Sequence, residues 1–153
     1  MARLSDIDEE LAAYLVDLPC PVFETPALIK GPPLNERRVA IVSTAGLQRR
    51  GDQPFAAEAS DYRIIPGDCT GGDIVMSHVS VEFDRTGFQQ DLNVVFPIDR
   101  LHELARDGKI GSVADFHYSV MGATPPEELE EAAHQLSGFL KADAVDAVLL
   151  VPV

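Results

Sequence analysis

Residues 73–100 gather polar and charged side chains between apolar segments. His78 ends an apolar run, Arg85 lies in the polar loop that follows, and Asp91 and Asn93 alternate with apolar residues further on. A histidine, an arginine and carboxylates placed in this way could move a proton or hold a small polar ligand. Such groups commonly lie on loops that a rigid scaffold holds in place.

His78 is the side chain of this stretch best suited to proton transfer at neutral pH. With Asp91 or Asp84 it could form a general base and its orienting carboxylate, or two ligands of a metal. Alternatively, His78 and Asn93 hydrogen-bond to loop backbone and only hold the turn together. Ser77 beside His78 makes no catalytic triad, because adjacent strand residues point to opposite faces. We keep His78 and Asp91 as candidate catalytic residues and Ser77 and Asn93 as candidate substrate-binding residues, and expect neither metal nor cofactor.

Cys69 is the side chain that could act as a nucleophile or redox centre. It lies in a glycine-rich turn at residues 67–73. Asp68 and Asp73 would raise the pKa of its thiol and so disfavour the reactive thiolate. The only other cysteine, Cys20, lies between two prolines and is interpreted as structural, so no Cys-x-x-Cys pair exists.

Arg49 and Arg50 could clamp a substrate carboxylate through paired hydrogen bonds. A solvated basic pair in an acidic protein is the alternative interpretation. His117, expected near the end of a later strand, is a further substrate-binding candidate, although such residues are more often aromatics at the edge of the core. The predicted ligand is a small amine or carboxylate.

Several unusual short sequence motifs occur in order along the chain. They are Ser-His at 77–78, Asp-Leu-Asn-Val-Val-Phe-Pro-Ile-Asp-Arg-Leu at 91–101, Gly-Lys-Ile-Gly at 108–111 and His-Tyr-Ser-Val-Met-Gly at 117–122. In these motifs the chain resembles the selenoprotein B family of the glycine/sarcosine/betaine and D-proline reductases, and most of all the short relatives in that family that carry no selenocysteine. The resemblance covers nearly the whole chain and is clearest over residues 38–153.

The resemblance implies an oxidoreductase-like protein. Selenoprotein B activates an amino acid or betaine for reductive carbon–nitrogen cleavage, using a selenol to take up the carbon fragment, which implies a redox partner protein here. This chain has no selenocysteine, so two alternatives stay open: a non-catalytic small-molecule-binding or interaction module, and a hydrolase- or lyase-type site using His78 and Asp91. Relatives are expected to continue past Val153 into a Cys-Pro-x-Cys segment, which makes this a truncated or a naturally short form.

Composition excludes some partners. Of 153 residues, 46% are hydrophobic and 24% charged, as in ordinary globular proteins. The net charge of −13 argues against nucleic acid and anionic membranes, because both require clustered Lys and Arg. No apolar run reaches membrane-spanning length and the first twenty residues lack a signal-peptide core, so we expect a cytoplasmic protein.

The apolar runs predict a single α/β domain with a mostly parallel, open, Rossmann-like sheet of about five strands and helices on both faces. Helices are expected at 97–107 and from 125 onward. Strands are expected near residues 38–44, 61–66, 74–78, 113–118 and 146–153. Those at 39–43, 74–77, 113–117 and 147–151 should lie adjacent and mostly parallel, which would bring the loops after Ser43, His78 and His117 to one edge of the sheet.

Residues 1–37 are expected to form a helix and a proline-rich connector that lies on the surface of the sheet core, residues 38–153. A capping box of Ser5 and Asp8 should open the helix. The apolar strand at 146–153 is predicted to be of the buried type, covered by a neighbouring chain or by the protein's own helices, since an exposed apolar edge invites pairing. A homodimer is therefore favoured over a monomer.

Overall fold

The structure, a computed structural model, describes residues 3–19, 22, 24–80 and 85–153. Cys20 and Asp84, both considered above, lie outside the described residues. Within the described part, no helix combines the length and the apolar character needed to span a bilayer.

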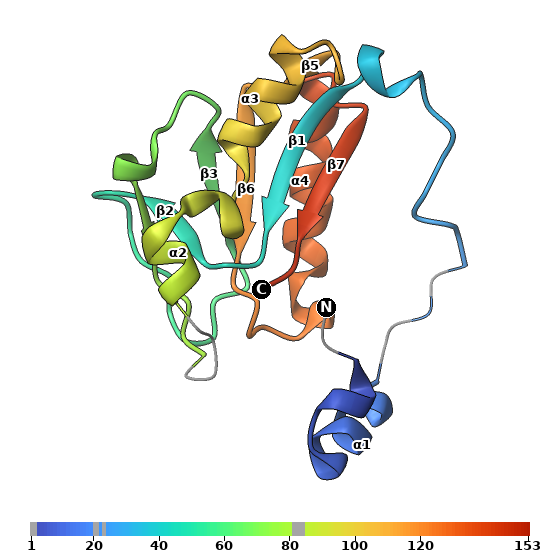
Figure 1. The fold of residues 1–153 in the computed structure, drawn as a ribbon, viewed down its shortest axis with the longest axis vertical. Coiled ribbons are helices and arrows are strands. Elements are labelled where there is room, and N and C mark those ends of the chain that lie inside the picture. The colour runs from blue at the N-terminus through green and yellow to red at the C-terminus, as the bar shows by residue number, and fades with distance from the viewer. Residues whose placement is uncertain (1–2, 20–21, 23, 81–84) are drawn as a thin grey trace.

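The sheet is built around β1 (Arg38–Ser43). β7 (Ala147–Val151) runs parallel along one edge of β1, while β5 (Ser112–Val113) and β6 (Phe116–Val120) run parallel along the other (Figure 1). β3 (Tyr62–Pro66) extends the sheet antiparallel beside β6. The prediction of an α/β fold with a mostly parallel sheet of five strands is confirmed, whereas its Rossmann-like character stays a prediction.

The predicted place of the 74–77 strand is wrong. β4 (Ile74–Met76) pairs antiparallel with β2 (Leu47–Arg49) in a separate two-stranded ribbon. Both edges of β1 are already occupied, and β3 occupies the outer edge of β6. β2 lies in the segment that follows β1, and β4 pairs with β2 instead.

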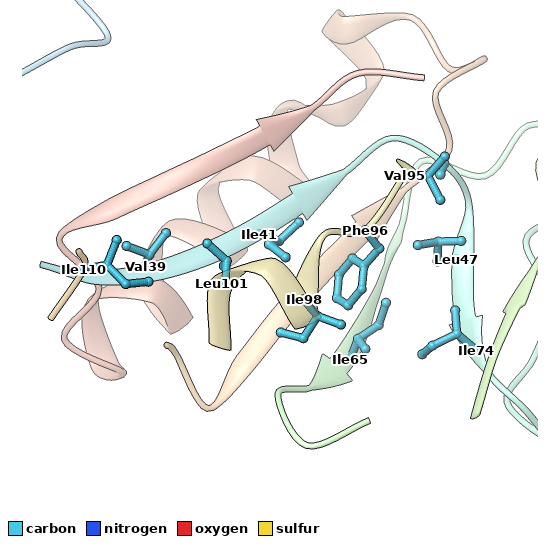
Figure 2. Packing of buried hydrophobic residues seen from close by; sticks show 11 residues of the cluster. Val39, Ile41, Leu47, Ile65, Ile74, Val95, Phe96, Ile98, Leu101 and Ile110 are labelled. Atoms are coloured by element: carbon cyan, nitrogen blue, oxygen red, sulfur yellow. The ribbon is translucent and has the colours of Figure 1, made fainter. Parts of the chain in front are cut away.

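Helices cover both faces of the sheet, as predicted. α3 (Ile98–Arg106) lies in front of the sheet in Figure 1 and α4 (Glu130–Ala142) behind it. Side chains from β1, β2, β3 and α3 form the larger core cluster (Figure 2). The second cluster joins α4 to the opposite side of β6. The short helices are α2 (Thr86–Gln90), η2 (Leu34–Glu36), η3 (Gly71–Asp73), η4 (Leu92–Val94) and η5 (Pro126–Leu129).

The N-terminal helix is separate from the sheet. It comprises η1 (Leu4–Asp6) and α1 (Glu9–Asp17), and Figure 1 shows α1 joined to the sheet by the extended connector. Asp8 itself caps α1, accepting the N–H groups of Glu10 and Leu11, so the predicted opening by Ser5 and Asp8 is wrong. Val22 and Leu28 are almost fully exposed, so the connector does not lie on the domain surface at these positions.

β7 is more exposed than predicted. Val148, Leu149 and Leu150 are all exposed, and Leu150 keeps 70% of its surface accessible. The prediction that the protein's own helices cover this strand is therefore wrong. Coverage by a neighbouring chain stays a prediction.

The Arg38 side chain connects several segments at the amino-terminal end of the sheet. Its guanidinium donates to the Asp143 carboxylate at 2.5 Å, to Asp115 at 2.9 Å and to the Val113 carbonyl at 2.8 Å. Burial alone would lower the pKa of Arg38, but the hydrogen bonds to Asp143 and Asp115 raise it. Burial would likewise raise the pKa of Asp143, but the hydrogen bonds from Arg38 and from backbone N–H groups lower it. Both groups are therefore charged at neutral pH.

His117 lies inside the core and not at a strand end. It is the second residue of β6, so the predicted position near the end of the strand is wrong. Its side chain is fully buried, its ring packs perpendicular to Phe96 at 5.7 Å, and its Nδ1 accepts the Ile41 N–H at 2.9 Å. Burial, with a smaller contribution from His102, lowers the pKa of His117 to about 4.

This burial predicts a pH-dependent stability. The native state keeps His117 neutral down to about pH 4, while the unfolded chain binds a proton below its ordinary pKa of 6.5. The contribution of neutral His117 to the free energy of unfolding is fully present above pH 6.5 and is lost as the pH falls toward 4. We expect a loss of about 2 kcal/mol between pH 7 and pH 5, measured by urea unfolding.

His117→Asn should retain an acceptor for the Ile41 N–H and remove the titration. The variant should lose less stability between pH 7 and pH 5 than the parent protein does. Equal losses in the two proteins would contradict the assignment.

Candidate functional site

The segments that follow β1, β4 and β6 meet at the carboxyl end of the parallel strands. Gly46 donates its N–H to the Val120 carbonyl at 3.0 Å, and Gly122 donates to the Thr44 carbonyl at 2.8 Å. Ser77 donates its N–H to the Gly46 carbonyl at 2.9 Å. The loops that were expected to meet at one edge do so after β1, β4 and β6, although β4 itself lies outside the main sheet. Open α/β sheets place ligands at this edge.

His78 is brought to this edge by the β2–β4 ribbon. Its side chain is buried, and its Nδ1 accepts the Ser80 N–H at 3.2 Å. Arg85 donates to the His78 carbonyl at 2.6 Å and to the Ser80 carbonyl at 3.0 Å. Burial, and then the nearby Arg85 charge, lower the pKa of His78. The imidazole is therefore neutral at pH 7 and carries its proton on Nε2.

Glycines allow the backbone to close over His78. A Cβ atom at Gly122 would lie 2.7 Å from the Thr44 carbonyl oxygen and 3.0 Å from His78 Nε2. Gly46 has a φ of +62° and lies beside the His78 backbone. Gly122 and Thr44 were not among the residues expected at the site, and Arg85 was considered only as a charge in the polar loop. The sequence feature that could have identified Gly122 is its position at the end of the His-Tyr-Ser-Val-Met-Gly motif, residues 117–122.

Ser77 makes contacts of a structural kind. Its hydroxyl donates to the Gln48 side-chain oxygen at 2.5 Å and accepts the Phe55 N–H at 3.0 Å. These contacts tie the end of β4 to β2 and to the loop that follows β2. A substrate-binding role for Ser77 stays a prediction.

Asp91 and Asn93 form a network at the start of α3. The Asp91 carboxylate accepts both the backbone N–H and the side-chain amide of Asn93, each at 2.9 Å. Asn93 also donates to Asp99 and accepts its N–H. The hydrogen bonds from Asn93 lower the pKa of Asp91. The described contacts of Asp91 thus belong to this turn, and its catalytic role stays a prediction.

Cys69, Arg49 and Arg50 lie together at the other end of the ribbon. Arg49 pairs with Ile74 in the β2–β4 register, so about 13 Å of extended chain separates it from His78. Arg50 donates its side chain to the Gly72 carbonyl at 3.1 Å. Burial raises the pKa of the Cys69 thiol, Arg49 opposes this, and Asp73, Asp68 and Asp52 add to the increase. The structure therefore does not bring Cys69 or the arginine pair to His78.

Two hollows in the described part lie at the opposite, amino-terminal end of β6. One, of about 400 Å³, is lined by apolar and aromatic side chains together with Asp115 and Asp143. The other, of about 530 Å³, lies between the turn at Gly67 and His102. Neither includes His78. Among the described residues, no group of three or more His, Cys, Asp or Glu side chains is placed to hold a metal ion.

Comparison with known proteins places the chain in a family. The profile described as glycine/sarcosine/betaine reductase selenoprotein B matches residues 10–153. The chain belongs to this family. The resemblance seen in the sequence is thereby confirmed. No solved structure matches the chain.

Curated members of the family are longer than this chain. D-proline reductase subunit gamma of Acetoanaerobium sticklandii is 34% identical over 76% of the chain and 49% of its own length. Betaine reductase complex component B subunit beta of Peptoclostridium acidaminophilum is 30% identical over 90% of the chain and 33% of its own length. Glycine reductase complex component B subunit gamma of Carboxydothermus hydrogenoformans is 29% identical with the same coverage. The chain therefore spans between a third and a half of these relatives.

Gly122→Ala should disturb the backbone over His78. The new methyl group would meet the Thr44 carbonyl at 2.7 Å, so we expect a loss of about 1–3 kcal/mol in the free energy of unfolding. Gly138→Ala is the control, because this helical glycine has open space around its Cβ position and should gain about 0.5–1 kcal/mol. Chemical denaturation of both variants checks the difference, and equal stability of the two would contradict it.

The Cys69 environment predicts a slow thiol. In a Cys20→Ser background, alkylation by iodoacetamide at pH 7 should be slower than that of glutathione, because burial and the acidic neighbours raise the pKa of Cys69 above its ordinary 9.0. The rate should still be increasing at pH 9, because the thiolate fraction levels off only above the raised pKa of the thiol. Alkylation faster than glutathione at pH 7 would show an activated nucleophile.

Proposed function

We propose that this chain is the substrate-binding component of a reductase of the selenoprotein B family. It would hold a small amino acid or betaine for reductive carbon–nitrogen cleavage, and a redox partner protein would supply the electrons. Membership of the family supports the reaction class, and the printed names of relatives describe subunits of reductase complexes. The whole reaction is proposed for the assembled complex, since the chain spans only part of its relatives' length.

The arrangement of His78 and Arg85 carries this proposal. Because His78 Nδ1 accepts the Ser80 N–H, its Nε2 carries the proton. This atom is buried beside Gly122, so it would donate to a carboxylate oxygen only after the segment at Gly122 moves aside. The Arg85 guanidinium lies within 2.6 Å of the His78 carbonyl and adds positive charge at the same edge. A planar guanidinium matches a carboxylate in geometry and charge. We therefore propose that Arg85, in place of Arg49 and Arg50, contacts the substrate carboxylate.

The position of Cys69 supports binding in preference to thiol chemistry by this chain. Its pKa is raised, and it lies at the far end of the ribbon from His78. A substrate held at His78 would therefore require a reducing group from another polypeptide. The alternative of a hydrolase- or lyase-type site gains no support, because the Asp91 carboxylate is engaged by Asn93.

The test is calorimetric titration of the protein with glycine, sarcosine, betaine and D-proline. We expect one of them to bind, and His78→Gln and Arg85→Ala each to weaken its binding at least tenfold. His134→Gln is the matched control, because its side chain is 80% exposed on α4. Asp91→Asn and Arg49→Ala should bind like the parent.

Two results would contradict the proposal. The first is the absence of binding by all four compounds at millimolar concentration. The second is unchanged binding by His78→Gln and Arg85→Ala while both variants remain folded by circular dichroism.

A further inference from the structure

β7 presents an uncharged apolar edge to solvent. Residues 147–153 contain no charged side chain. In the described structure β7 pairs with β1 alone, and Figure 1 shows it at the border of the sheet. Val148 and Leu149 are each 39% exposed and Leu150 is 70% exposed, so apolar surface is accessible on both faces of the strand. Soluble proteins usually cover or charge such an edge, because it pairs readily with another strand.

The outward backbone groups of β7 can be assigned from its bonds to β1. The Val151 carbonyl accepts the Thr44 N–H, whereas the Ile41 N–H points the other way, to His117 on β6. Because backbone groups alternate along a strand, residues 147, 149 and 151 face β1. Val148 and Leu150 therefore direct their N–H and carbonyl groups away from the sheet.

This outward set is symmetric about Leu149. In an antiparallel pair with a second copy, Val148 lies opposite Leu150 of that copy, and Leu150 opposite its Val148, so each pair exchanges both backbone hydrogen bonds. Such an isologous contact closes on itself about a two-fold axis. Pro152, the next outward residue, has no N–H, and the Asp146 N–H is already bound to the Arg38 carbonyl. Longer pairing with an unrelated strand would lack partners at both ends.

Charge also favours this edge for self-association. Each copy carries a net charge of −13, so most contacts between two copies are opposed by repulsion. β7 itself contributes no charged side chain to this repulsion. An antiparallel arrangement places the two Asp146 side chains at opposite ends of the contact. We propose that β7 pairs antiparallel with β7 of a second copy, centred on Leu149, to join the two sheets into one.

The first experiment measures mass in solution by light scattering. The protein should have twice the chain mass of 16.6 kDa, and Leu150→Lys should reduce it to one chain mass. Leu150 is 70% exposed within one copy, so the lysine should leave the fold intact and act at the contact. Leu104→Lys, at a 40% exposed leucine of α3, is the control and should remain a dimer. A monomer at about 1 mM protein, or a dimer unaffected by Leu150→Lys, would overturn the proposal.

The second experiment tests the register. In a background with Cys20→Ser and Cys69→Ser, Leu149→Cys should form a disulfide dimer on mild oxidation. The two copies of residue 149 would form a non-hydrogen-bonded pair with Cα atoms about 4.5 Å apart. Leu104→Cys has nearly the same exposure and should cross-link only at the rate of random collision. Equal cross-linking at the two positions would exclude a contact centred on Leu149.

Discussion

The ion-paired Arg38 is the interaction on which the arrangement of the sheet depends. It stands at the first residue of β1 and reaches Val113 at the end of β5, Asp115 before β6 and Asp143 at the end of α4. One side chain thereby links the starts of β1 and β6 to the end of β5 and to the end of α4, the helix that precedes β7. The ion pair with Asp143 is largely shielded from solvent, since 22% and 14% of the two side chains are exposed. Loss of either partner would leave the other charge poorly solvated, which is more costly than loss of a surface ion pair.

Local patterns in the sequence were sufficient for most elements and insufficient for their pairing. The apolar runs at 38–43 and 147–151 and the amphipathic α3 and α4 form where periodicity placed them, whereas the strand expected at 113–118 is observed at 116–120. β4 was misplaced because an apolar run of three residues does not specify its partner. The pairing of β4 with β2 depends on the whole chain, in which β5, β6 and β7 pair with β1. The exposure of Leu150 was also unpredictable, because a buried strand and an uncovered edge strand can have the same apolar composition.

The candidate site shows the same division. His78 was identified from its residue type, and the structure brings it to the expected edge. Residue type alone could not reveal that Asn93 engages Asp91, or that the β2–β4 register carries Arg49 away from His78. Arg85 was visible as a charge in a polar loop, but its contact with the His78 carbonyl depends on how that loop folds back. The sequence thus gives candidates, and backbone topology decides which of them meet.

The central position of β1 also shapes how the protein reaches its native state. The hydrogen bond from Ile41 to His117 spans 76 residues, and the bond from Arg38 to Asp146 spans 108. During synthesis β1 leaves the ribosome long before either neighbouring strand exists, so it must wait with both edges unpaired. Contacts so distant in sequence slow folding, because loop-closure entropy is lost before the contacts are gained. The nascent chain is therefore exposed to aggregation through β1 until Ala147–Val151 has been made.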